Sequence, residues 1–302
     1  MQRPLIYAHR GGAGLWPELT LHAYQNALAL GVDCVDLDVH LSQDKVVVVT
    51  HDPYISHTLA RHNHHFLSQP GPAIRELTVD DIQSYDVGRL NPDATYQENY
   101  PEQVPQDGEM IPTLEQVLSL CERQSHRQMH YQIEIKNAPG TLAEGVPPHE
   151  IVPRVAEVLK KFHIGKRATI HSFLWENVLL AKSLLPDITT ACITDTQALC
   201  DKMYPAAKDW YAGFTFKQLG EVPTILKQLQ VSVWNPEGNT LKREWIDQAH
   251  AAGIKVIPWT VDNPERMKTL IEAGIDGIIT NRPDLMRDIL VQLHYPTPKL
   301  WP

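Results

Sequence analysis

Two histidines and two aspartates near the start of this chain stand within or directly after short apolar runs. His9 and His51 each end or follow such a run, and Asp36 and Asp38 lie inside one. Because an imidazole titrates near neutral pH, His9 and His51 are candidates for a general acid and a general base. One isolated histidine is more often a hydrogen-bonded residue at a strand end, but two in similar positions favour a catalytic pair.

The acidic residues indicate a second kind of chemistry. Alternate residues of a strand point to the same side, so Asp36 shares a face with Asp38, and Glu134 shares one with Lys136. If these faces meet, three carboxylates come together, and a divalent cation is their natural partner. All-oxygen ligation favours Ca²⁺, Mg²⁺ or Mn²⁺ over Zn²⁺. The same spacing occurs in ordinary surface strands, so the residues alone leave both interpretations open.

Apolar, strand-like runs alternate with helical patterns over most of the chain. The expected strands cover residues 4–9, 34–41, 46–50, 131–136, 168–173, 189–194, 231–234, 255–261 and 277–280. The expected helices cover residues 20–30, 113–123, 150–162, 175–185, 196–203, 222–229, 242–252, 264–273 and 283–293, with a break near the start of the third at Pro153. About eight alternations predict an α/β fold, a parallel (β/α)₈ barrel with its active face at the carboxyl ends of the strands. A doubly wound sheet competes with this fold, but the glycines after the first strand lack GxGxxG spacing.

One long irregular region, residues 53–112, interrupts this alternation. It is rich in Pro, Asn, Asp and His and holds one helical segment near residues 78–85. Because it is too long for a simple connection, we interpret it as a small insertion over the site. Residues 1–302 then form one barrel domain with an insertion after the early strands.

The overall composition argues against several classes of partner. The chain has 302 residues and a formal net charge of −9, with 43% hydrophobic and 21% charged residues. These values are typical of a globular protein with a sizeable core, and they argue against a nucleic-acid or anionic-membrane surface. No apolar run approaches the roughly 20 residues of a membrane helix, so we expect no integral membrane segment. Nothing in the sequence indicates an oligomeric state.

The N-terminus and the cysteines bear on the compartment. The chain enters strand-like sequence at once, without a basic and apolar leader. We therefore expect a cytoplasmic protein, or a periplasmic or secreted one if a signal peptide precedes this sequence. The cysteines lack CxxC spacing and are expected to be buried thiols, which fits a reducing compartment.

Two smaller features have weaker links to chemistry. His57, His62, His64 and His65 form a His-rich loop that suggests a transition-metal site or, more plausibly, a role in selecting the substrate alcohol. Ser172 has no GxSxG elbow around it and is interpreted as a pocket or packing residue. If Ser172 faces the mouth of the barrel, its neighbour in the strand, His171, points away from it.

Several short motifs occur in order along the chain. They are His9-Arg10-Gly11, Pro17-Glu18 with Thr20, Asp38, His51-Asp52, Glu134-Ile135-Lys136, Ser172-Phe173, Trp259-Thr260-Val261 and residues 276–280. In these motifs the chain resembles the glycerophosphodiester phosphodiesterase family, from about residue 7 to residue 283. The resemblance implies a phospholipase C-like TIM barrel with a small inserted subdomain, in agreement with the insertion expected above.

The resemblance also implies an activity, the metal-dependent hydrolysis of glycerophosphodiesters to sn-glycerol 3-phosphate and an alcohol. It implies that His9 and His51 are the acid–base pair. It further implies that one divalent cation, commonly Ca²⁺ or Mg²⁺, is held by Asp36, Asp38 and Glu134.

The resemblance gives three further residues a role at the substrate. Arg10 and Lys136 would contact phosphate oxygens, and Trp259 would line a pocket for glycerol. Metal, guanidinium and ammonium would together stabilise the charge that develops on the phosphate oxygens during displacement. A local positive charge of this kind explains how an acidic protein would bind an anionic substrate.

Three positions depart from the pattern of the family. Asp36 replaces the usual Glu, so its carboxylate lies one methylene nearer the backbone, and the metal must shift, take a water or change identity. Leu19 replaces the usual Asn of the first loop, and Asn281 replaces an acidic residue that often follows the late Thr. None of these changes removes a histidine of the acid–base pair, so we expect activity to survive.

Two alternative functions stay open. One keeps the fold and the metal but acts on lysophospholipids or another phosphodiester, which a long apolar groove beside the insertion would favour. The other is a catalytically silent protein that binds glycerophosphodiesters, which the departures at Leu19, Asp36 and Asn281 make conceivable.

Overall fold

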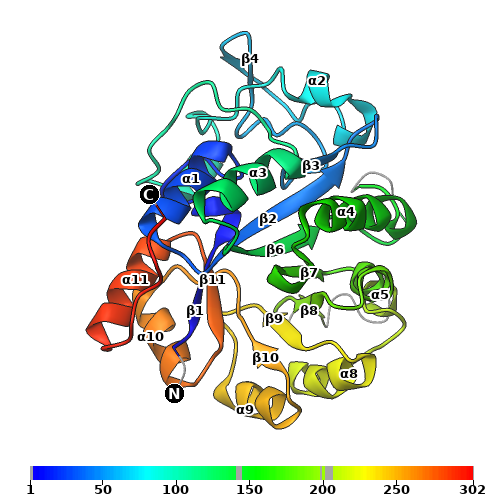
Figure 1. Ribbon diagram of the computed structural model, residues 1–302, viewed down its shortest axis with the longest axis vertical. Coiled ribbons are helices and arrows are strands. Elements are labelled where there is room, and N and C mark those ends of the chain that lie inside the picture. Colours follow the sequence, from blue (N-terminus) through cyan, green and yellow to red (C-terminus); the bar gives the residue numbers. More distant parts are fainter. Residues whose placement is uncertain (1–2, 141–144, 198, 201–206, 302) are drawn as a thin grey trace.

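The computed structural model describes residues 3–140, 145–197, 199–200 and 207–301, and its central element is a nearly closed parallel barrel (Figure 1). In this part of the chain the eight barrel strands follow one another in the order β1, β2, β6, β7, β8, β9, β10 and β11. Their bounds are β1 (Leu5–Ala8), β2 (Cys34–Leu41), β6 (His130–Ile135), β7 (Ala168–Ser172), β8 (Thr189–Thr194), β9 (Val233–Pro236), β10 (Lys255–Val256) and β11 (Gly277–Thr280). The prediction of a (β/α)₈ barrel is confirmed.

The barrel closes between β10 and β11 without a full ladder. β10 covers two residues instead of the seven expected. Beyond it Ile257 and Trp259 still donate to β9, whereas Pro258 has no N–H to donate to β11. Backbone hydrogen bonds from Asp276 N to Val256 O (2.9 Å) and from Ile279 N to Pro258 O (3.0 Å) nevertheless join the two edges. The strands therefore enclose one interior.

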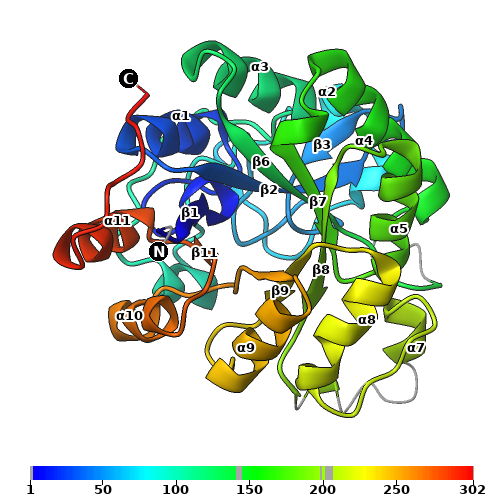
Figure 2. The same ribbon diagram turned by 60° about the horizontal axis from the view of Figure 1, so that its bottom comes forward.

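Helices surround this barrel on the outside (Figure 2). Their bounds are α1 (Leu21–Leu30), α3 (Leu114–Gln124), α4 (Pro148–Phe162), α5 (Trp175–Leu184), α7 (Ala207–Trp210), α8 (Val222–Leu229), α9 (Arg243–Ala251), α10 (Pro264–Glu272) and α11 (Pro283–Gln292). α4 runs continuously through Pro153, so the break expected there is wrong. The helix expected over residues 196–203 lies partly outside the described residues.

The insertion follows a hairpin that extends β2. β3 (Val47–Val49) pairs antiparallel with the end of β2, and an isolated bridge joins Val48 to Thr113. The short elements between them are β4 (Arg61–His62), β5 (His65–Phe66), η2 (Ile74–Glu76), α2 (Val79–Ile82) and η3 (Thr95–Asn99). Of these elements, η2 and α2 contribute to an apolar cluster separate from the barrel core, formed by Val48, Ile55, Ala60, Ile74, Ile82, Val87 and Ile111. The small early insertion is confirmed, whereas the single-domain organisation stays a prediction.

The barrel interior changes character along its axis. Its apolar cluster is formed by Tyr7, Cys34, Ala191, Val233, Ile257 and Ile279. Because alternate strand residues share a face, Asp36 and Asp38 face the same interior as Cys34, further along β2. One end of the interior is thus apolar and the other carries charge.

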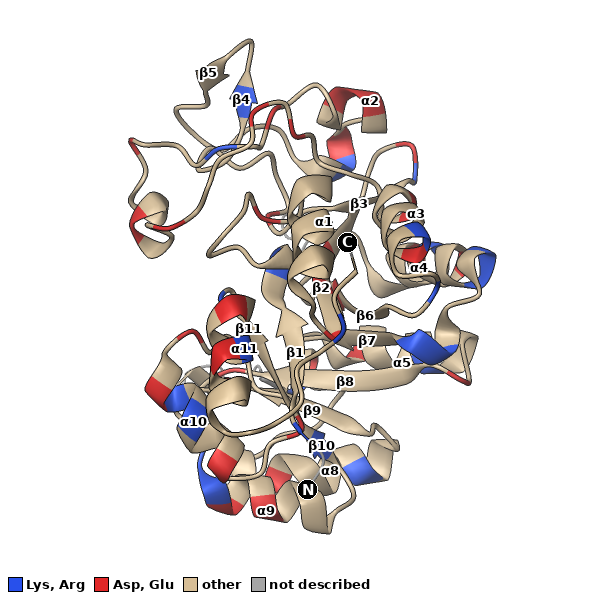
Figure 3. Cartoon of the chain, turned by 60° about the vertical axis from the view of Figure 1, so that its left-hand side comes forward, with Lys and Arg blue, Asp and Glu red and all other residues tan. Residues whose placement is uncertain are grey.

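The outer surface agrees with the composition. The four cysteines are all buried, as expected. Figure 3 shows acidic and basic residues interspersed along α9 and α10. No helix within the described ranges has the length and apolarity needed to cross a bilayer.

Candidate active site

His9 and Arg10 leave β1 in a tight turn at the barrel mouth. The turn is η1 (His9–Gly11), and Arg10 adopts a left-handed φ of 51°, which residues with a side chain rarely do. Gly11 follows with a φ of 79°, and a Cβ added there would lie 2.9 Å from Cβ of Ala23. Only glycine fits this position. The turn places Arg10 against the carboxylate of Asp38.

The ring of His9 is oriented by a chain of two residues. Asn281 donates from Nδ2 to Asp262 Oδ2 at 2.8 Å, so its Oδ1 faces Nδ1 of His9, at 2.6 Å. Because that oxygen can only accept, Nδ1 of the neutral imidazole carries the hydrogen and Nε2 carries the lone pair. The departure at Asn281 therefore supplies an orienting contact.

His51 is oriented in a parallel way by a charged neighbour. Its Nδ1 lies 2.8 Å from Asp52 Oδ1, which leaves Nε2 as the other reactive atom. Burial, together with the charges of Arg10 and Lys136, lowers the pKa of His51, although Asp52 opposes this change. His51 is therefore neutral at neutral pH and able to accept a proton. His40 donates from Nε2 to the carbonyl oxygen of His51 at 3.0 Å, because that oxygen can only accept. Burial lowers the pKa of His40 to about 4, so its ring is neutral.

Two carboxylates and two cations meet beside these histidines. Asp38 of β2 and Glu134 of β6 are register partners on adjacent parallel strands. Lys136 Nζ lies 2.9 Å from Glu134 Oε1, and Arg10 Nε lies 3.2 Å from Asp38 Oδ2. Burial alone would raise the pKa of Asp38, but Lys136 and Arg10 outweigh it and hold this pKa well below its usual range. His51 and His9 lower the same pKa, so all of these groups share one site.

The insertion contributes to this site through Arg10. Arg10 Nη1 lies 2.9 Å from Glu18 Oε1 and 3.1 Å from the hydroxyl of Tyr96, which itself donates to Glu18. Tyr96 belongs to η3 of the insertion. The guanidinium is thus clamped between the first loop and the insertion. Leu19, the third departure, is buried with a left-handed φ of 60°, a conformation that suits Asn better.

Asp36 lies deeper than Asp38 and has a different neighbour. Its Oδ1 is 3.3 Å from Nε2 of His171 on β7. The side chain of Ser172 instead contacts the carbonyl of Ile135 (2.8 Å) and the amide of Leu174 (3.2 Å), as a packing residue does. The side of β7 that faces the interior is therefore the one that carries His171.

The residue types fit a divalent cation. Asp36 Oδ1 and Asp38 Oδ2 are buried carboxylate oxygens without a hydrogen-bond partner, a costly state that a cation would relieve. Glu134 adds a third carboxylate at the register position of Asp38. In the part of the chain that the structure describes, however, no three His, Cys, Asp or Glu side chains are already arranged around one metal position. The structure joins Asp38 with Glu134 and leaves Asp36 with His171.

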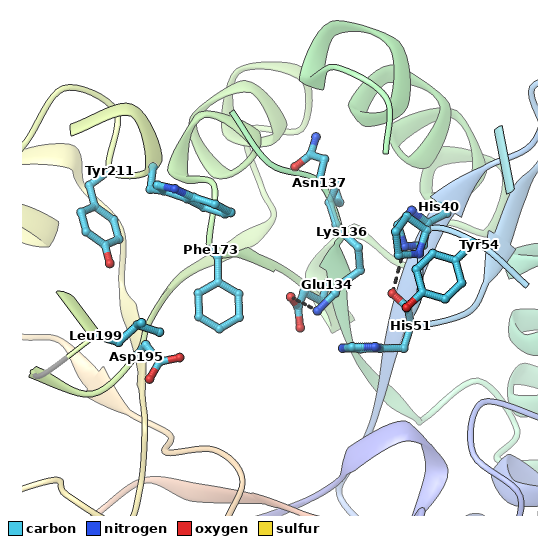
Figure 4. A pocket seen from close by; sticks show the side chains of 13 residues that line it. His40, His51, Tyr54, Glu134, Lys136, Asn137, Phe173, Asp195, Leu199 and Tyr211 are labelled. Carbon is cyan, nitrogen blue, oxygen red and sulfur yellow. Dashed lines mark hydrogen bonds and ion pairs between the residues drawn. The ribbon is translucent and has the colours of Figure 1, made fainter. Parts of the chain in front are cut away.

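A cavity of about 470 Å³ opens beside this cluster. Figure 4 shows Glu134 and Lys136 at its centre, with His51 and Tyr54 on one side and Phe173 on the other. Its far wall is formed by Leu199, Trp210 and Tyr211, with Asp195 as the acidic group.

Trp259 lies half-buried beside Phe173. Its ring packs edge-on against Phe173 at 5.2 Å, and its Nε1 donates to the carbonyl of Asn235. The His-rich loop has a different setting: His62 and His65 pair across the exposed β4–β5 hairpin, and His64 lies in its turn.

The sequence argument did not foresee the contacts of several residues of the site. Each acts on a residue that the motifs had identified: Asn281 and Asp262 on His9, Asp52 on His51, Tyr96 and Glu18 on Arg10, and His171 on Asp36. The adjacency of Asp52 to His51 and of Glu18 to Pro17 was visible in the motifs. The other contacts join distant parts of the chain and left no local signal.

Comparisons with known proteins agree on one family. The model of the glycerophosphoryl diester phosphodiesterase family matches residues 9–285. A glycerophosphodiester phosphodiesterase of Caldanaerobacter subterraneus is 25% identical over 292 residues, which cover 95% of this chain and 98% of that protein.

Solved structures agree with the same fold. The crystal structure of a proposed glycerophosphoryl diester phosphodiesterase from Silicibacter pomeroyi has a TM-score of 0.86 at 27% identity, covering 98% of this chain and 96% of its own. A phosphodiesterase of Oleispira antarctica, solved with its product sn-glycerol-3-phosphate, has a TM-score of 0.70 at 22% identity. The match covers 96% of this chain and 97% of that chain.

Proposed function

This chain belongs to the glycerophosphoryl diester phosphodiesterase family, and we propose that it hydrolyses glycerophosphodiesters with water to sn-glycerol 3-phosphate and an alcohol. The observation that carries the proposal is the shared site of Asp38, Arg10, Lys136 and the two histidines at the barrel mouth. The product bound to the Oleispira antarctica relative supports the choice of substrate class.

In this proposal two partly buried, positively charged side chains bind the phosphodiester. Arg10 and Lys136 flank the Asp38–Glu134 pair and would contact non-bridging phosphate oxygens, where charge increases during displacement. Burial would lower the pKa of Lys136, but Glu134 and Asp38 outweigh it and raise this pKa, so the ammonium stays charged. Trp259 would line the glycerol side of the pocket.

The two histidines move the protons. One, as a neutral imidazole, accepts the proton of the attacking oxygen as its bond to phosphorus forms. The other, as an imidazolium, donates its Nε2 proton to the alcohol oxygen as the second bond breaks. His9 and His51 suit these roles because Nδ1 of each ring is held by a neighbour, which leaves Nε2 for the substrate. Each such transfer contributes about 10²–10⁴-fold to the rate.

The carboxylates Asp36, Asp38 and Glu134 would hold one divalent cation. When bound, the cation would supply Lewis-acid stabilisation of the phosphoryl oxygens. The buried carboxylate oxygens without hydrogen bonds support this assignment.

The test is the release of sn-glycerol 3-phosphate from glycerophosphocholine, with Ca²⁺, Mg²⁺, Mn²⁺ or EDTA. We expect release with at least one cation and none with EDTA. Binding of glycerophosphocholine without release under every condition would contradict the proposal and favour a silent binding protein.

A second substrate class is favoured by one observation. The cavity beside Lys136 has a largely apolar wall, with Phe173, Leu199, Trp210 and Tyr211. Such a wall would accept a glycerol moiety that carries an acyl chain, as in a lysophospholipid. Parallel assays of lysophosphatidylcholine and glycerophosphocholine decide between the two substrate classes, because the two molecules differ only in the acyl chain on glycerol. A higher kcat/KM for the lysophospholipid would identify the apolar wall as the site of that chain.

A further inference from the structure

Two buried polar atoms face each other inside the barrel without a hydrogen bond. Asp36 Oδ1 and His171 Nε2 are 3.3 Å apart, and both lack a hydrogen-bond partner. Asp36 is 2% exposed and His171 is 3% exposed, so bulk water does not replace the missing partner. A buried carboxylate oxygen in this state is costly and calls for an occupant.

Two further strands also carry buried polar atoms without a hydrogen-bond partner. Gln132 Oε1 and Asn235 Oδ1 are also buried without a partner. Both belong to strand faces that point into the barrel, because Gln132 alternates with Glu134 and Asn235 with Val233 of the interior cluster. The interior below the mouth is therefore a polar compartment with unused acceptors.

We propose that His171 Nε2 and Asp36 Oδ1 are joint ligands of the divalent cation, and that this nitrogen ligand makes the site prefer Mn²⁺ to Ca²⁺. The proposal rests on the proposed function for the presence of a cation. Two neighbouring ligands of one metal, each bonded at about 2.1 Å, lie about 3.0–3.4 Å apart. The observed separation of 3.3 Å fits this spacing.

The length of Asp36 explains why an imidazole is needed. An aspartate carboxylate lies one methylene nearer the backbone than a glutamate carboxylate, so a cation held by Asp36 lies deeper between the strands. The inward-facing residue of β7 at that depth is His171, whose ring reaches the carboxylate. The shorter acid and the histidine thus act as a pair.

Gln132 can set the required tautomer. In the structure its amide nitrogen Nε2 lies 3.4 Å from Nδ1 of His171. A flip of this amide exchanges its nitrogen and oxygen and would turn Oε1 to that atom, so that Gln132 accepts the Nδ1 hydrogen of His171 and leaves the lone pair of Nε2 for a metal. The same orientation satisfies the unpartnered Oε1 of Gln132.

The ligand atoms, carboxylate oxygens and one imidazole nitrogen, determine the preference for Mn²⁺ over Ca²⁺. Ca²⁺ takes oxygen ligands almost exclusively, whereas an imidazole ligand suits first-row transition cations. A site with carboxylates and one imidazole therefore binds Mn²⁺ more tightly, relative to Ca²⁺, than one with carboxylates alone.

The test compares metal binding by three forms of the full chain freed of metal with a chelator: wild type, His171→Gln and His51→Gln. Calorimetric titration gives the affinities for Mn²⁺ and Ca²⁺, and pulsed electron paramagnetic resonance of the Mn²⁺ form detects a directly bonded imidazole nitrogen. We expect the nitrogen signal in wild type and His51→Gln and its loss in His171→Gln. We also expect the ratio of Mn²⁺ to Ca²⁺ affinity to fall at least tenfold in His171→Gln.

The outcomes separate this inference from the proposed activity. A wild-type Mn²⁺ spectrum without nitrogen coupling overturns it, even if His171→Gln does not fold. An unchanged affinity ratio in folded His171→Gln overturns it as well and leaves His171 as a positioning residue for Asp36. Release of sn-glycerol 3-phosphate with no nitrogen ligand would keep the proposed function, whereas a nitrogen ligand without release would keep only the metal site.

Discussion

The two ends of the barrel each bury a carboxylate beside a guanidinium, and they satisfy these groups very differently. Where β6 and β7 begin, Arg167 donates to both oxygens of Glu122 at 2.6 and 2.7 Å, and Tyr131 donates to the same carboxylate at 2.7 Å. At the mouth, Arg10 and Asp38 are 3.2 Å apart, and Arg10 Nε and Asp38 Oδ2 have no hydrogen-bond partner.

We interpret the Arg167–Glu122 pair as a structural contact and the Arg10–Asp38 pair as part of a binding site. The carboxylate of Glu122 already has its hydrogen bonds, so a ligand would not stabilise it further, and its contacts hold α3 against β6. A pair with unmet hydrogen bonds is stabilised further when an anion and a cation arrive. At the mouth, Arg10 Nε and Asp38 Oδ2 can therefore still bind a ligand, whereas the carboxylate at the opposite end is already satisfied by hydrogen bonds.

The largest expected effect is on turnover and arises at the mouth. His9→Ala and His51→Ala should each lower kcat by at least 10²-fold, because each removes one proton transfer. The midpoint of thermal unfolding should stay close to that of wild type, measured by circular dichroism. Wild-type kcat in either variant would remove that histidine from the mechanism.

The next effect is on stability and arises at the opposite end. Glu122→Gln should lower the free energy of unfolding by about 2–3 kcal/mol, because Arg167 loses its charged partner. The matched control is Glu115→Gln on the same helix, whose exposed pair with Lys161 should contribute less than about 1 kcal/mol. Denaturant unfolding measures both. A large fall in kcat for Glu122→Gln would contradict the division between the two ends.

A smaller effect should appear in the pH profile of activity. Burial and the charges of Arg10 and Lys136 lower the pKa of His51, and its hydrogen bond with Asp52 opposes this by raising the pKa. Asp52→Asn should therefore move the limb of kcat/KM that reports His51 to lower pH. Movement of the acidic limb identifies His51 as the base, and movement of the basic limb identifies it as the acid. A profile that moves to higher pH would contradict the assigned contact.

The smallest effect concerns acid stability. Burial would raise the pKa of Glu122, but its bonds to Arg167 and Tyr131 outweigh burial and lower it. A lowered pKa means that the unfolded chain binds the proton first, so this stabilisation is present above about pH 4.3 and is lost as pH falls below it. The stability difference between wild type and Glu122→Gln should narrow in that range. A constant difference down to pH 3 would show that the charge of Glu122 contributes little.

The order of strands and helices was predictable because each reflects a local pattern of apolar residues and glycines. The expected strand over residues 255–261 was too long, because the regular ladder covers only residues 255–256 and continues past Pro258 as single contacts, such as the bridge from Trp259 to Glu237. The motifs identified His9, Arg10 and Asp38 but not their partners. Asn281 lies 272 residues from His9 in the sequence, and such a contact is created by barrel closure alone.

His171 shows a different limit. Period-two alternation says that His171 and Ser172 face opposite sides, but the pattern does not say which one faces inward. The register with Glu134 decides this, and it places the imidazole inside.

The separate apolar cluster under the insertion has a consequence for the contacts of Arg10. Because Val48, Ile55 and Ile82 pack among themselves rather than in the barrel core, replacement of the segment between β3 and Thr113 leaves the barrel packing intact. Yet the segment carries Tyr96, which reaches the clamp on Arg10. A different segment at this place would thus change the contacts of Arg10 without repacking the apolar core of the barrel.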